Sequence, residues 1–281
     1  MTLSTLAEVM QSTKKSKGYV VGFVVQGWED AKAFVEAASE TNSNIVLQAG
    51  PTFRDNMPLE AIGKMFQILA RNTSVKIGAH LDHGNDIEVC KEALDVGFTS
   101  VMFDGSRRSL NENIEETLKV CDLAKQYKAS VEAELGFVGY KQIDQNRLTC
   151  PNEVQIFSET VPINALAISV GNTHLQTGHL AKIDYKLLAE IRKASKSPLV
   201  IHGGSGVSPM DRKKMSSEFN VSKFNIGTEL RMVFGSALRK AIYSDEIRFD
   251  RVQIMEETID PVYTATIEIL KGFGGPNHSL S

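Results

Sequence analysis

The stretch VKIGAHLDHGNDIEVCKEALDVGFTSVMFDGS, residues 75–106, contains the repeating unit that decides the fold of this chain. It begins with one short apolar run, Val75–Ala79, and ends with another, Thr99–Phe103. Between them, residues 86–97 follow a helical pattern that opens at Asp86, with acidic Glu88 in the first turn. Short, nearly continuous apolar runs are typical of strands buried on both faces of a parallel sheet. The stretch therefore predicts a strand–helix–strand unit.

The same alternation runs from residue 19 to about residue 240. An unbroken series of eight such units predicts a (β/α)8 TIM barrel, which we expect to be one domain over residues 1–281. Residues 2–17 predict an extra N-terminal helix, and about 247–275 predict one or two closing helices. A doubly wound sheet is less favoured, because Val25-Gln-Gly-Trp28 is not the Gly-rich turn that would follow its first strand. The predicted strands are Tyr19–Val25, Asn44–Ala49, Val75–Ala79, Thr99–Phe103, Ser130–Leu135, Ala165–Val170, Pro198–Ile201 and Ser222–Ile226, and the predicted helices are about 29–41, 58–72, 86–97, 111–128, 151–160, 184–196, 208–219 and 228–243.

The composition excludes several classes of protein. Apolar residues make up 42% and charged residues 23%, as in an ordinary globular protein. The net charge of −3 favours neither a nucleic-acid partner nor an anionic membrane surface. No apolar run reaches the roughly 18 residues that span a bilayer, and the polar segment Met1–Tyr19 is not typical of a signal peptide. The widely spaced Cys90, Cys121 and Cys150 indicate a reducing compartment, so we expect a cytoplasmic protein.

Polar residues gather where the predicted strands end, which in a TIM barrel is the catalytic face. His83, His174 and His202 follow three different strands and can approach one ion from three directions. Three neutral imidazoles with an open position are typical of a catalytic zinc-type site. His80 shares a short loop with His83 and is predicted to support the site or to lie in the core. The alternative, that these residues only end strands and cap helices, weakens as more of them converge on one rim.

The polar residues at the predicted strand ends belong to six motifs, which are His80-Leu-Asp-His-Gly84, Phe103-Asp-Gly-Ser106, Val131-Glu-Ala-Glu-Leu-Gly136, Gly171-Asn-Thr-His174, His202-Gly-Gly-Ser-Gly206 and Asn225-Ile-Gly-Thr-Glu-Leu230. These motifs occur in the order and spacing of the class II, metal-dependent ketose-bisphosphate aldolases, and the chain resembles this family over nearly its whole length. The resemblance implies reversible retro-aldol cleavage of a phosphorylated ketose to dihydroxyacetone phosphate, or a close relative, and an aldehyde. It also implies a TIM barrel that assembles as a homodimer or homotetramer.

The resemblance also implies roles for single residues. His83, His174 and His202 resemble the ligands of one catalytic Zn²⁺, and Asp82 resembles the acid/base. Asp104 and Glu134 match the family's carboxylates around the metal, and a monovalent cation is compatible with this family. The segment Phe137–Cys150 matches a mobile catalytic loop. The residues that resemble contacts to the dihydroxyacetone phosphate half are Gly203, Ser205, Asn225, Gly227 and Thr228.

The chemistry of these residue types agrees with that resemblance. Retro-aldol cleavage leaves an enediolate, whose charge a divalent cation stabilises without a Schiff-base Lys. A carboxylate beside the metal, such as Asp82, can accept the proton of the cleaved carbinol. The alternative is that Asp82 has only a structural role as a helix N-cap. The turns Gly203–Gly206 and Gly227-Thr228 precede helices, where backbone N–H groups bind phosphate.

The substrate-holding residues depart from the family pattern. Leu175-Gln-Thr-Gly178 stands where the family usually has Gly directly after the His and a Lys nearby. Phe23-Val24 and Gly50-Pro51 also differ, and Arg107-Arg108 add two cations after the fourth strand. Because guanidinium groups bind phosphate or carboxylate through a fork, we expect a ketose other than fructose 1,6-bisphosphate to be preferred. The alternative is that both Arg residues form surface ion pairs.

Two other functions remain open from the sequence. A metal-dependent hydrolase or isomerase of a sugar phosphate on the same barrel would need an activated water, and Asn225 and Thr228 argue weakly against it. A non-catalytic sugar-phosphate sensor would have no need to keep Asp82 beside a full set of His residues.

Overall fold

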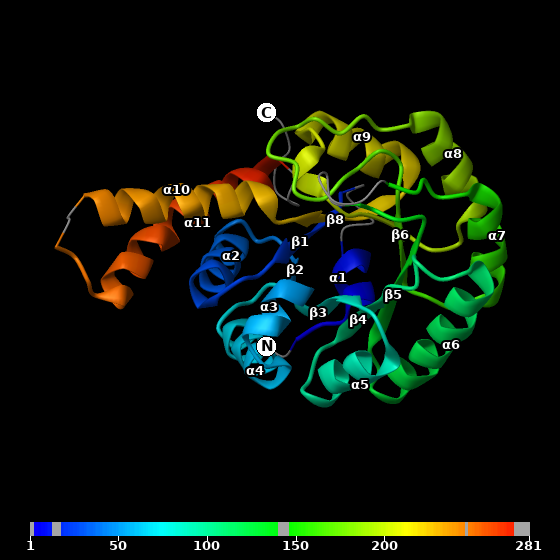
Figure 1. Cartoon of the computed structure of the whole chain (residues 1–281), viewed down its shortest axis with the longest axis horizontal. Coiled ribbons are helices and arrows are strands. Elements are labelled where there is room, and N and C mark those ends of the chain that lie inside the picture. The colour runs from blue at the N-terminus through cyan, green and yellow to red at the C-terminus, as the bar shows by residue number, and fades with distance from the viewer. Residues whose placement is uncertain (1–2, 13–17, 140–145, 245–246, 273–281) are drawn as a thin grey trace.

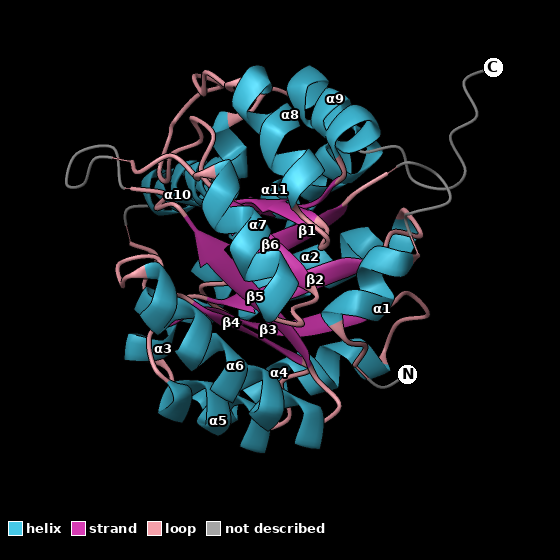
Figure 2. Ribbon diagram, turned by 90° about the vertical axis from the view of Figure 1, so that its right-hand side faces the viewer, coloured by secondary structure: helices cyan, strands magenta, loops and turns pink. Residues whose placement is uncertain are grey.

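The computed structural model describes residues 3–12, 18–139, 146–244 and 247–272. Eight parallel strands form a closed barrel in chain order, from β1 to β8, with β8 pairing back to β1. Helices surround the strands on the outside (Figures 1 and 2). The predicted TIM barrel is therefore confirmed, whereas its extent as one domain over residues 1–281 stays a prediction.

The elements follow the predicted alternation closely. Among the described residues, no helix is both long and apolar enough to cross a membrane. The strands are β1 (Val20–Val24), β2 (Ile45–Ala49), β3 (Ile77–Gly84), β4 (Ser100–Phe103), β5 (Ser130–Leu135), β6 (Ala165–Ile168), β7 (Leu199–Ile201) and β8 (Val221–Ile226), and the helices are α1 (Leu6–Gln11), α2 (Trp28–Glu40), α3 (Pro51–Asn56), α4 (Leu59–Arg71), α5 (Ile87–Asp95), α6 (Leu110–Gln126), α7 (Pro151–Thr160), α8 (Tyr185–Ala194), α9 (Pro209–Phe219), α10 (Thr228–Tyr243) and α11 (Arg251–Gly272), with a 3₁₀ turn at Gly204–Gly206.

The N-terminal helix α1 packs against the end of the barrel opposite to the predicted catalytic face. Thr5 and Glu8 form a capping box that starts this helix. Its buried residues Leu6, Val9 and Met10 form a separate apolar cluster with residues that point into the barrel, among them Val20, Val46, Met102 and Val200. This confirms an extra N-terminal helix, although residues 2 and 13–17 of the predicted segment lie outside the described residues. The apolar cluster leaves the opposite end of the barrel for polar chemistry.

Strand β3 differs from its prediction. The sequence predicts its end at Ala79, but the strand continues to Gly84 and carries the polar motif within it. The pairing with β4 shifts register between Leu81 and Gly84. A Cβ atom at Gly84 would lie 2.8 Å from the carbonyl oxygen of Met102, so only glycine fits there. The extension places the strand's polar residues at the rim by strand pairing and not by a loop.

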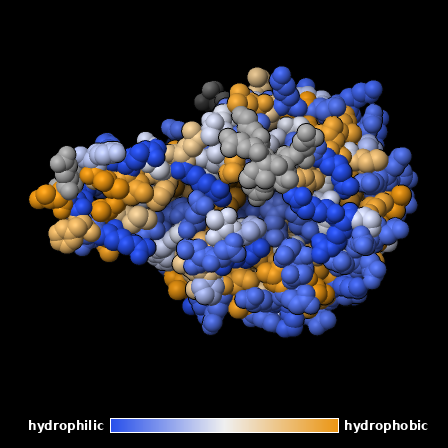
Figure 3. Space-filling view, viewed as in Figure 1, coloured by the Kyte–Doolittle hydropathy of each residue, from blue (hydrophilic) through white to orange (hydrophobic). Residues whose placement is uncertain are grey.

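The C-terminal helices α10 and α11 form a hairpin that projects from one side of the barrel (Figure 1). Helix α11 packs against both α10 and α2, and residues 245–246 between the two helices of the hairpin lie outside the described part of the chain. Apolar side chains gather at the projecting end (Figure 3), where Tyr243 is 79% exposed and Phe249 is 93% exposed. The prediction of closing helices is confirmed for the described residues, and the last part of the predicted tail, 273–275, is outside them.

Candidate active site

A cavity of about 140 Å³ opens at the C-terminal ends of the strands. Eight of the predicted site residues line it, and they come from β3, β8 and the loops after β6, β7 and β8. His202, Asp104 and Glu134 are not among its lining residues but contact the imidazoles that surround it. The predicted residues that line the cavity are Asp82, His83, His174, Gly203, Ser205, Asn225, Gly227 and Thr228.

An irregularity in β3 brings two neighbouring side chains into this cavity. Adjacent residues of a regular strand point to opposite faces. Asp82 and His83 nevertheless both line the cavity, because the register of β3 shifts here and His83 adopts a left-handed backbone with φ of 52°. A non-glycine residue in that region is strained, as is common where a side chain is held for function.

The unpredicted helix α3 fixes this strained segment. Its Arg54 donates from Nη1 to the carbonyl oxygens of Ala49, at 2.9 Å, and Asp82, at 2.6 Å. Its Nη2 donates to the carbonyl oxygen of His83 at 3.1 Å. One planar guanidinium thus ties β2 to the irregular end of β3. No sequence pattern distinguishes Arg54, which is one basic residue in a short polar stretch.

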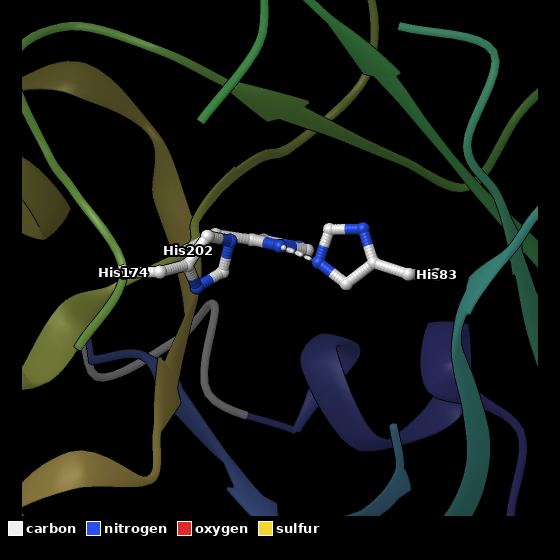
Figure 4. Close-up of side chains that lie close together, drawn as sticks. All are labelled: His83, His174 and His202. Carbon is white, nitrogen blue, oxygen red and sulfur yellow. Dashed lines mark hydrogen bonds between the residues drawn. The ribbon is translucent and has the colours of Figure 1, made fainter. Parts of the chain in front are cut away.

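Three imidazoles meet beside the cavity (Figure 4). Ligand atoms of His83, His174 and His202 all lie within 4.8 Å of one another. The ring centroids of His83 and His202 are 4.7 Å apart, and those of His83 and His174 are 5.4 Å apart. The convergence predicted from three strand ends is therefore present in the fold.

The hydrogen bonds of two imidazoles make the site suitable for a cation. Nδ1 of His83 lies 2.7 Å from Asp104, and Nε2 of His202 lies 3.0 Å from Glu132. Donation to these carboxylates places the hydrogens on those nitrogens and leaves lone pairs on Nε2 of His83 and Nδ1 of His202. These two nitrogens face each other at 2.9 Å. Two lone pairs so close call for a positive charge between them, which the donor set of three imidazoles would supply by binding a divalent metal.

The titration of the site reflects the same crowding. Burial opposes a charge on His83, but Asp82 and the hydrogen bond to Asp104 raise its pKa to about 10. Burial and the neighbouring His83 lower the pKa of His202 to about 3. Burial and the charges of His83 and His202 also lower the pKa of His174 well below its usual range. With Nδ1 of His83 bound to Asp104, the additional proton of His83 lies on Nε2, so it occupies the same place between His83 and His202 that a bound cation would take.

The carboxylates divide between two sides of His83. Asp104 accepts from its Nδ1 side, and Glu134 lies 3.8 Å from the same nitrogen, so these two carboxylates with His83 form a second group of possible metal ligands. Burial and the nearby Asp104 raise the pKa of Glu134 to about 8. Asp82 lies on the cavity side, with Oδ1 3.4 Å from the amide of Asn225. Burial opposes its ionisation, but His83 and His202 lower its pKa, so Asp82 is a carboxylate.

A buried charge network below the imidazoles was missed from the sequence. Lys223 donates to Oε2 of Glu132 at 2.7 Å, and both side chains are fully buried inside the barrel. Since Oε1 of Glu132 binds His202, the network links a lysine of β8 to the imidazole group. His80 lies beside it, with Nδ1 2.8 Å from Ser100, and does not line the cavity. The signals of this network in the sequence are Lys223 and Glu132, two charged residues inside predicted strands.

The loop after β6 places His174. Asn172 donates to the carbonyl oxygens of Ile168 and His202, which joins this loop to β7. Asn146 donates to the carbonyl oxygen of Asn172, so the described part of the predicted mobile loop contacts the same segment, whereas residues 140–145 lie outside the description. Directly after the histidine, Leu175 has φ of 56° and lines the cavity. The backbone here keeps a conformation that favours glycine while carrying a leucine side chain.

The turns after β7 and β8 pack against each other. Gly203 has φ of 61°, and a Cβ atom there would lie 2.3 Å from the carbonyl oxygen of Thr173. The hydroxyl of Ser205 accepts from the backbone N–H groups of Gly227, at 3.2 Å, and Glu229, at 3.3 Å. The first turn of α10, whose N-cap residue Gly227 has no side chain, therefore meets the 3₁₀ turn at the cavity wall through Ser205. Exposed helix amides and Gly-rich turns are suited to an anion.

Arg107 and Arg108 lie away from the cavity. The guanidinium of Arg107 stacks over the ring of Phe137 at 4.1 Å. Nε of Arg108 pairs with Glu116 at 3.0 Å, and its Nη2 donates to the carbonyl oxygen of Asn85 at 2.8 Å. Neither is among the residues that line the cavity, whereas Arg231 of α10 is. The expected contact of the two Arg residues with the substrate has no support in this geometry.

Comparison with known proteins agrees with the residues described above. A family model described as class II fructose-bisphosphate aldolase matches residues 4–278. The chain belongs to the class II fructose-bisphosphate aldolase family. It is accordingly a metal-dependent aldolase, a lyase of carbohydrate metabolism, and the hydrolase or isomerase alternative is not favoured.

Similar proteins support this membership of the class II aldolase family. A fructose-bisphosphate aldolase of Staphylococcus aureus (strain Mu50) is 32% identical over 287 residues, which cover 99% of this chain and 100% of the relative. The crystal structure of the YdjI aldolase from Escherichia coli K12 superposes with a TM-score of 0.84 at 27% identity, covering 98% of both chains. The fructose-bisphosphate aldolase of Campylobacter jejuni, at 20% identity, shares the fold with a TM-score of 0.80.

Proposed function

We propose that this aldolase binds one catalytic Zn²⁺ through His83, His174 and His202. The observation that carries the proposal is the pair of lone-pair nitrogens of His83 and His202, 2.9 Å apart, whose tautomers are fixed by carboxylates. When bound, the metal supplies stabilisation of the negative charge that develops on the ketone fragment. Asp104 and Glu134 are proposed to tune this group from the far side of His83. A monovalent cation at the site stays a prediction.

In the proposed reaction, Asp82 moves the proton that cleavage requires. Its carboxylate accepts the proton of the carbinol hydroxyl as the carbon–carbon bond breaks, and returns it to the aldehyde in synthesis. The lowered pKa of Asp82 supports the role of base, and its position in the cavity wall supports access to the substrate. The alternative role as a helix cap has no support, because α5 is capped by Asp86, which accepts from the N–H of Val89.

The phosphate of the dihydroxyacetone phosphate half is proposed to bind where the two turns meet. Gly203 and Ser205 come from the turn after β7, and Gly227 and Thr228 begin α10. The N-terminus of a helix attracts an anion through its N–H groups and its dipole. Asn225, between this turn and Asp82, is proposed to contact the ketone half.

Leu175 supports a substrate other than fructose 1,6-bisphosphate. Its left-handed backbone costs about 1–2 kcal/mol of strain in a non-glycine residue. Its side chain lies in the cavity wall at a position where the family usually has glycine. We infer that the space for the aldehyde half is thereby altered. The relative from Staphylococcus aureus carries the name fructose-bisphosphate aldolase, so fructose 1,6-bisphosphate is the natural comparison substrate.

The experiment that tests the function combines metal analysis with a coupled assay for dihydroxyacetone phosphate release. A panel of ketose phosphates and bisphosphates identifies the substrate, and Leu175→Gly is expected to raise activity on fructose 1,6-bisphosphate. Leu180→Gly is the matched control, because Leu180 is exposed in the same loop and is not among the lining residues. Full activity after EDTA stripping would refute the metal proposal. Wild-type kcat/KM on fructose 1,6-bisphosphate of about 10⁴ M⁻¹s⁻¹ or more would refute the substrate proposal.

We also propose that the enzyme is a cytoplasmic homo-oligomer, a dimer or tetramer. The apolar end of the α10–α11 hairpin, which includes Tyr243, Ile247, Phe249 and Val252, supports an interface between copies. Replacing Phe249 and Ile247 by Ser should shift the assembly toward monomers in sedimentation velocity. An unchanged sedimentation coefficient at low protein concentration would count against this interface.

A further inference from the structure

A fully buried arginine lies behind the two turns proposed to bind phosphate. Arg212, on α9, is 1% exposed and is among the largest fully buried side chains of the described residues. It lies in the first turn of α9, which begins at Pro209 and has Ser208 as its N-cap. Arginine is almost never buried to this degree unless it is paired.

The guanidinium joins the two turns. Its Nε and Nη2 donate to the carbonyl oxygen of Gly204, at 3.1 and 2.8 Å. The same Nη2 lies 2.8 Å from Oε1 of Glu229, in the first turn of α10. On the cavity side, Ser205 accepts from the N–H of Glu229. The turn after β7 and the start of α10 are thus linked twice, by Ser205 in front and by Arg212 behind.

Stability alone does not explain this arrangement. Replacing a buried ion pair by apolar residues of similar volume is often neutral or stabilising. A leucine or methionine at position 212 would fill the same space between α9 and the barrel. What it would lose is the fixed spacing between the carbonyl of Gly204 and the carboxylate of Glu229.

We propose that Arg212 is a positioning residue that holds the phosphate-binding turns in register, and this proposal rests on the proposed function. The planar fork fixes two acceptors from different elements at once, which the point charge of a lysine cannot do. By keeping the 3₁₀ turn and the N-terminus of α10 at one spacing, Arg212 preorganises the backbone N–H groups that meet the phosphate. Arg212 does not line the cavity, so it acts through the turns and not by touching the substrate.

The test compares Arg212→Met and Arg212→Lys with the wild-type holoenzyme. Arg192→Met is the matched control, because Arg192 is an exposed arginine on the neighbouring helix α8. The measurements are KM and kcat on the best ketose phosphate, kcat/KM on the same ketose without phosphate, and the Kd of inorganic phosphate by calorimetry. We expect Arg212→Met to raise KM and the phosphate Kd about tenfold to hundredfold, with kcat changed by less than about threefold. We expect Arg212→Lys to raise both about fivefold, and the unphosphorylated ketose and Arg192→Met to show no loss.

Two outcomes would overturn the proposal. One is an unchanged KM and phosphate Kd in folded Arg212→Met, and the other is an equal loss on the unphosphorylated ketose, which would indicate a purely structural role. If Arg212→Met does not fold, Arg212→Lys decides by the same criteria. A wild-type enzyme that cleaves no ketose phosphate would refute the proposed function, but the Kd of inorganic phosphate would still test Arg212.

Discussion

Replacing Glu132 by Gln, alone and together with Lys223→Met, should separate the stability of the barrel from its affinity for metal. The carboxylate of Glu132 binds Lys223 at 2.7 Å and His202 at 3.0 Å, and all three side chains are fully buried. A glutamine has one oxygen and one NH₂ group. If the oxygen faces Lys223, the NH₂ group faces Nε2 of His202 and favours the tautomer with its hydrogen on Nδ1, where the metal should bind. If the NH₂ group faces Lys223, two donors oppose each other.

The expected magnitudes follow from these contacts. Glu132→Gln leaves Lys223 as a buried cation without its counter-charge, which should destabilise the protein by about 3–5 kcal/mol. Loss of the carboxylate behind His202 should weaken zinc binding by about tenfold to hundredfold, which is about 1.4–2.8 kcal/mol. The double variant Glu132→Gln, Lys223→Met removes both charges. It should therefore recover most of the stability while metal binding stays weak.

The assays are urea unfolding of EDTA-treated protein and competition for Zn²⁺ with a chromophoric chelator. Glu115→Gln is a control, because Glu115 and Lys119, 2.8 Å apart, form an exposed ion pair that should contribute little to stability. Stability losses of Glu132→Gln and Lys223→Met that add up in the double variant would refute the coupling. Wild-type zinc affinity in the double variant would refute the role of Glu132 in orienting His202.

Three further outcomes are expected. His174→Ala should lower metal content sharply and abolish activity, as measured by metal analysis and the coupled assay, and retained stoichiometric zinc would contradict the ligand assignment. Asp82→Ala should lower kcat by about two to four orders of magnitude with little change in metal content or melting temperature, and near-normal turnover would exclude it as the acid/base. Burial raises the pKa of Asp30 to about 6 despite the hydrogen bond from the N–H of Gln26, so its ionisation costs stability as pH rises through 6. Asp30→Asn should therefore be more stable than wild type at pH 8, by at most about 3 kcal/mol, and this advantage should vanish below about pH 4, as measured by urea unfolding at each pH. An equal difference at both pH values would show that the pKa of Asp30 is not raised.

The alternation of short apolar runs with amphipathic segments was enough to predict the barrel. Strand and helix periodicities are local properties, and a series of eight such units has few ways to bury its apolar faces. Because parallel strands bring their carboxyl ends to one face, the order of the units also predicted that His83, His174 and His202 would converge. The proposal for Asp82 likewise began with its place beside His83 in the sequence.

Only the tertiary structure decided how these residues are held. Local patterning predicted the end of β3 at Ala79, but pairing with β4 extends it and shifts its register, which turns Asp82 and His83 to the same cavity. The tertiary structure also placed Arg107 and Arg108 outside the cavity lining. The sequence could not predict this, because a charged residue in a loop reveals nothing about the direction of its side chain. The buried links made by Lys223 to Glu132 and by Arg212 to Glu229 each join two different elements of the fold. Hydrophobic periodicity cannot predict such links. A buried charge is tolerated only when it is paired and hydrogen-bonded, and these partners meet only after the barrel has closed.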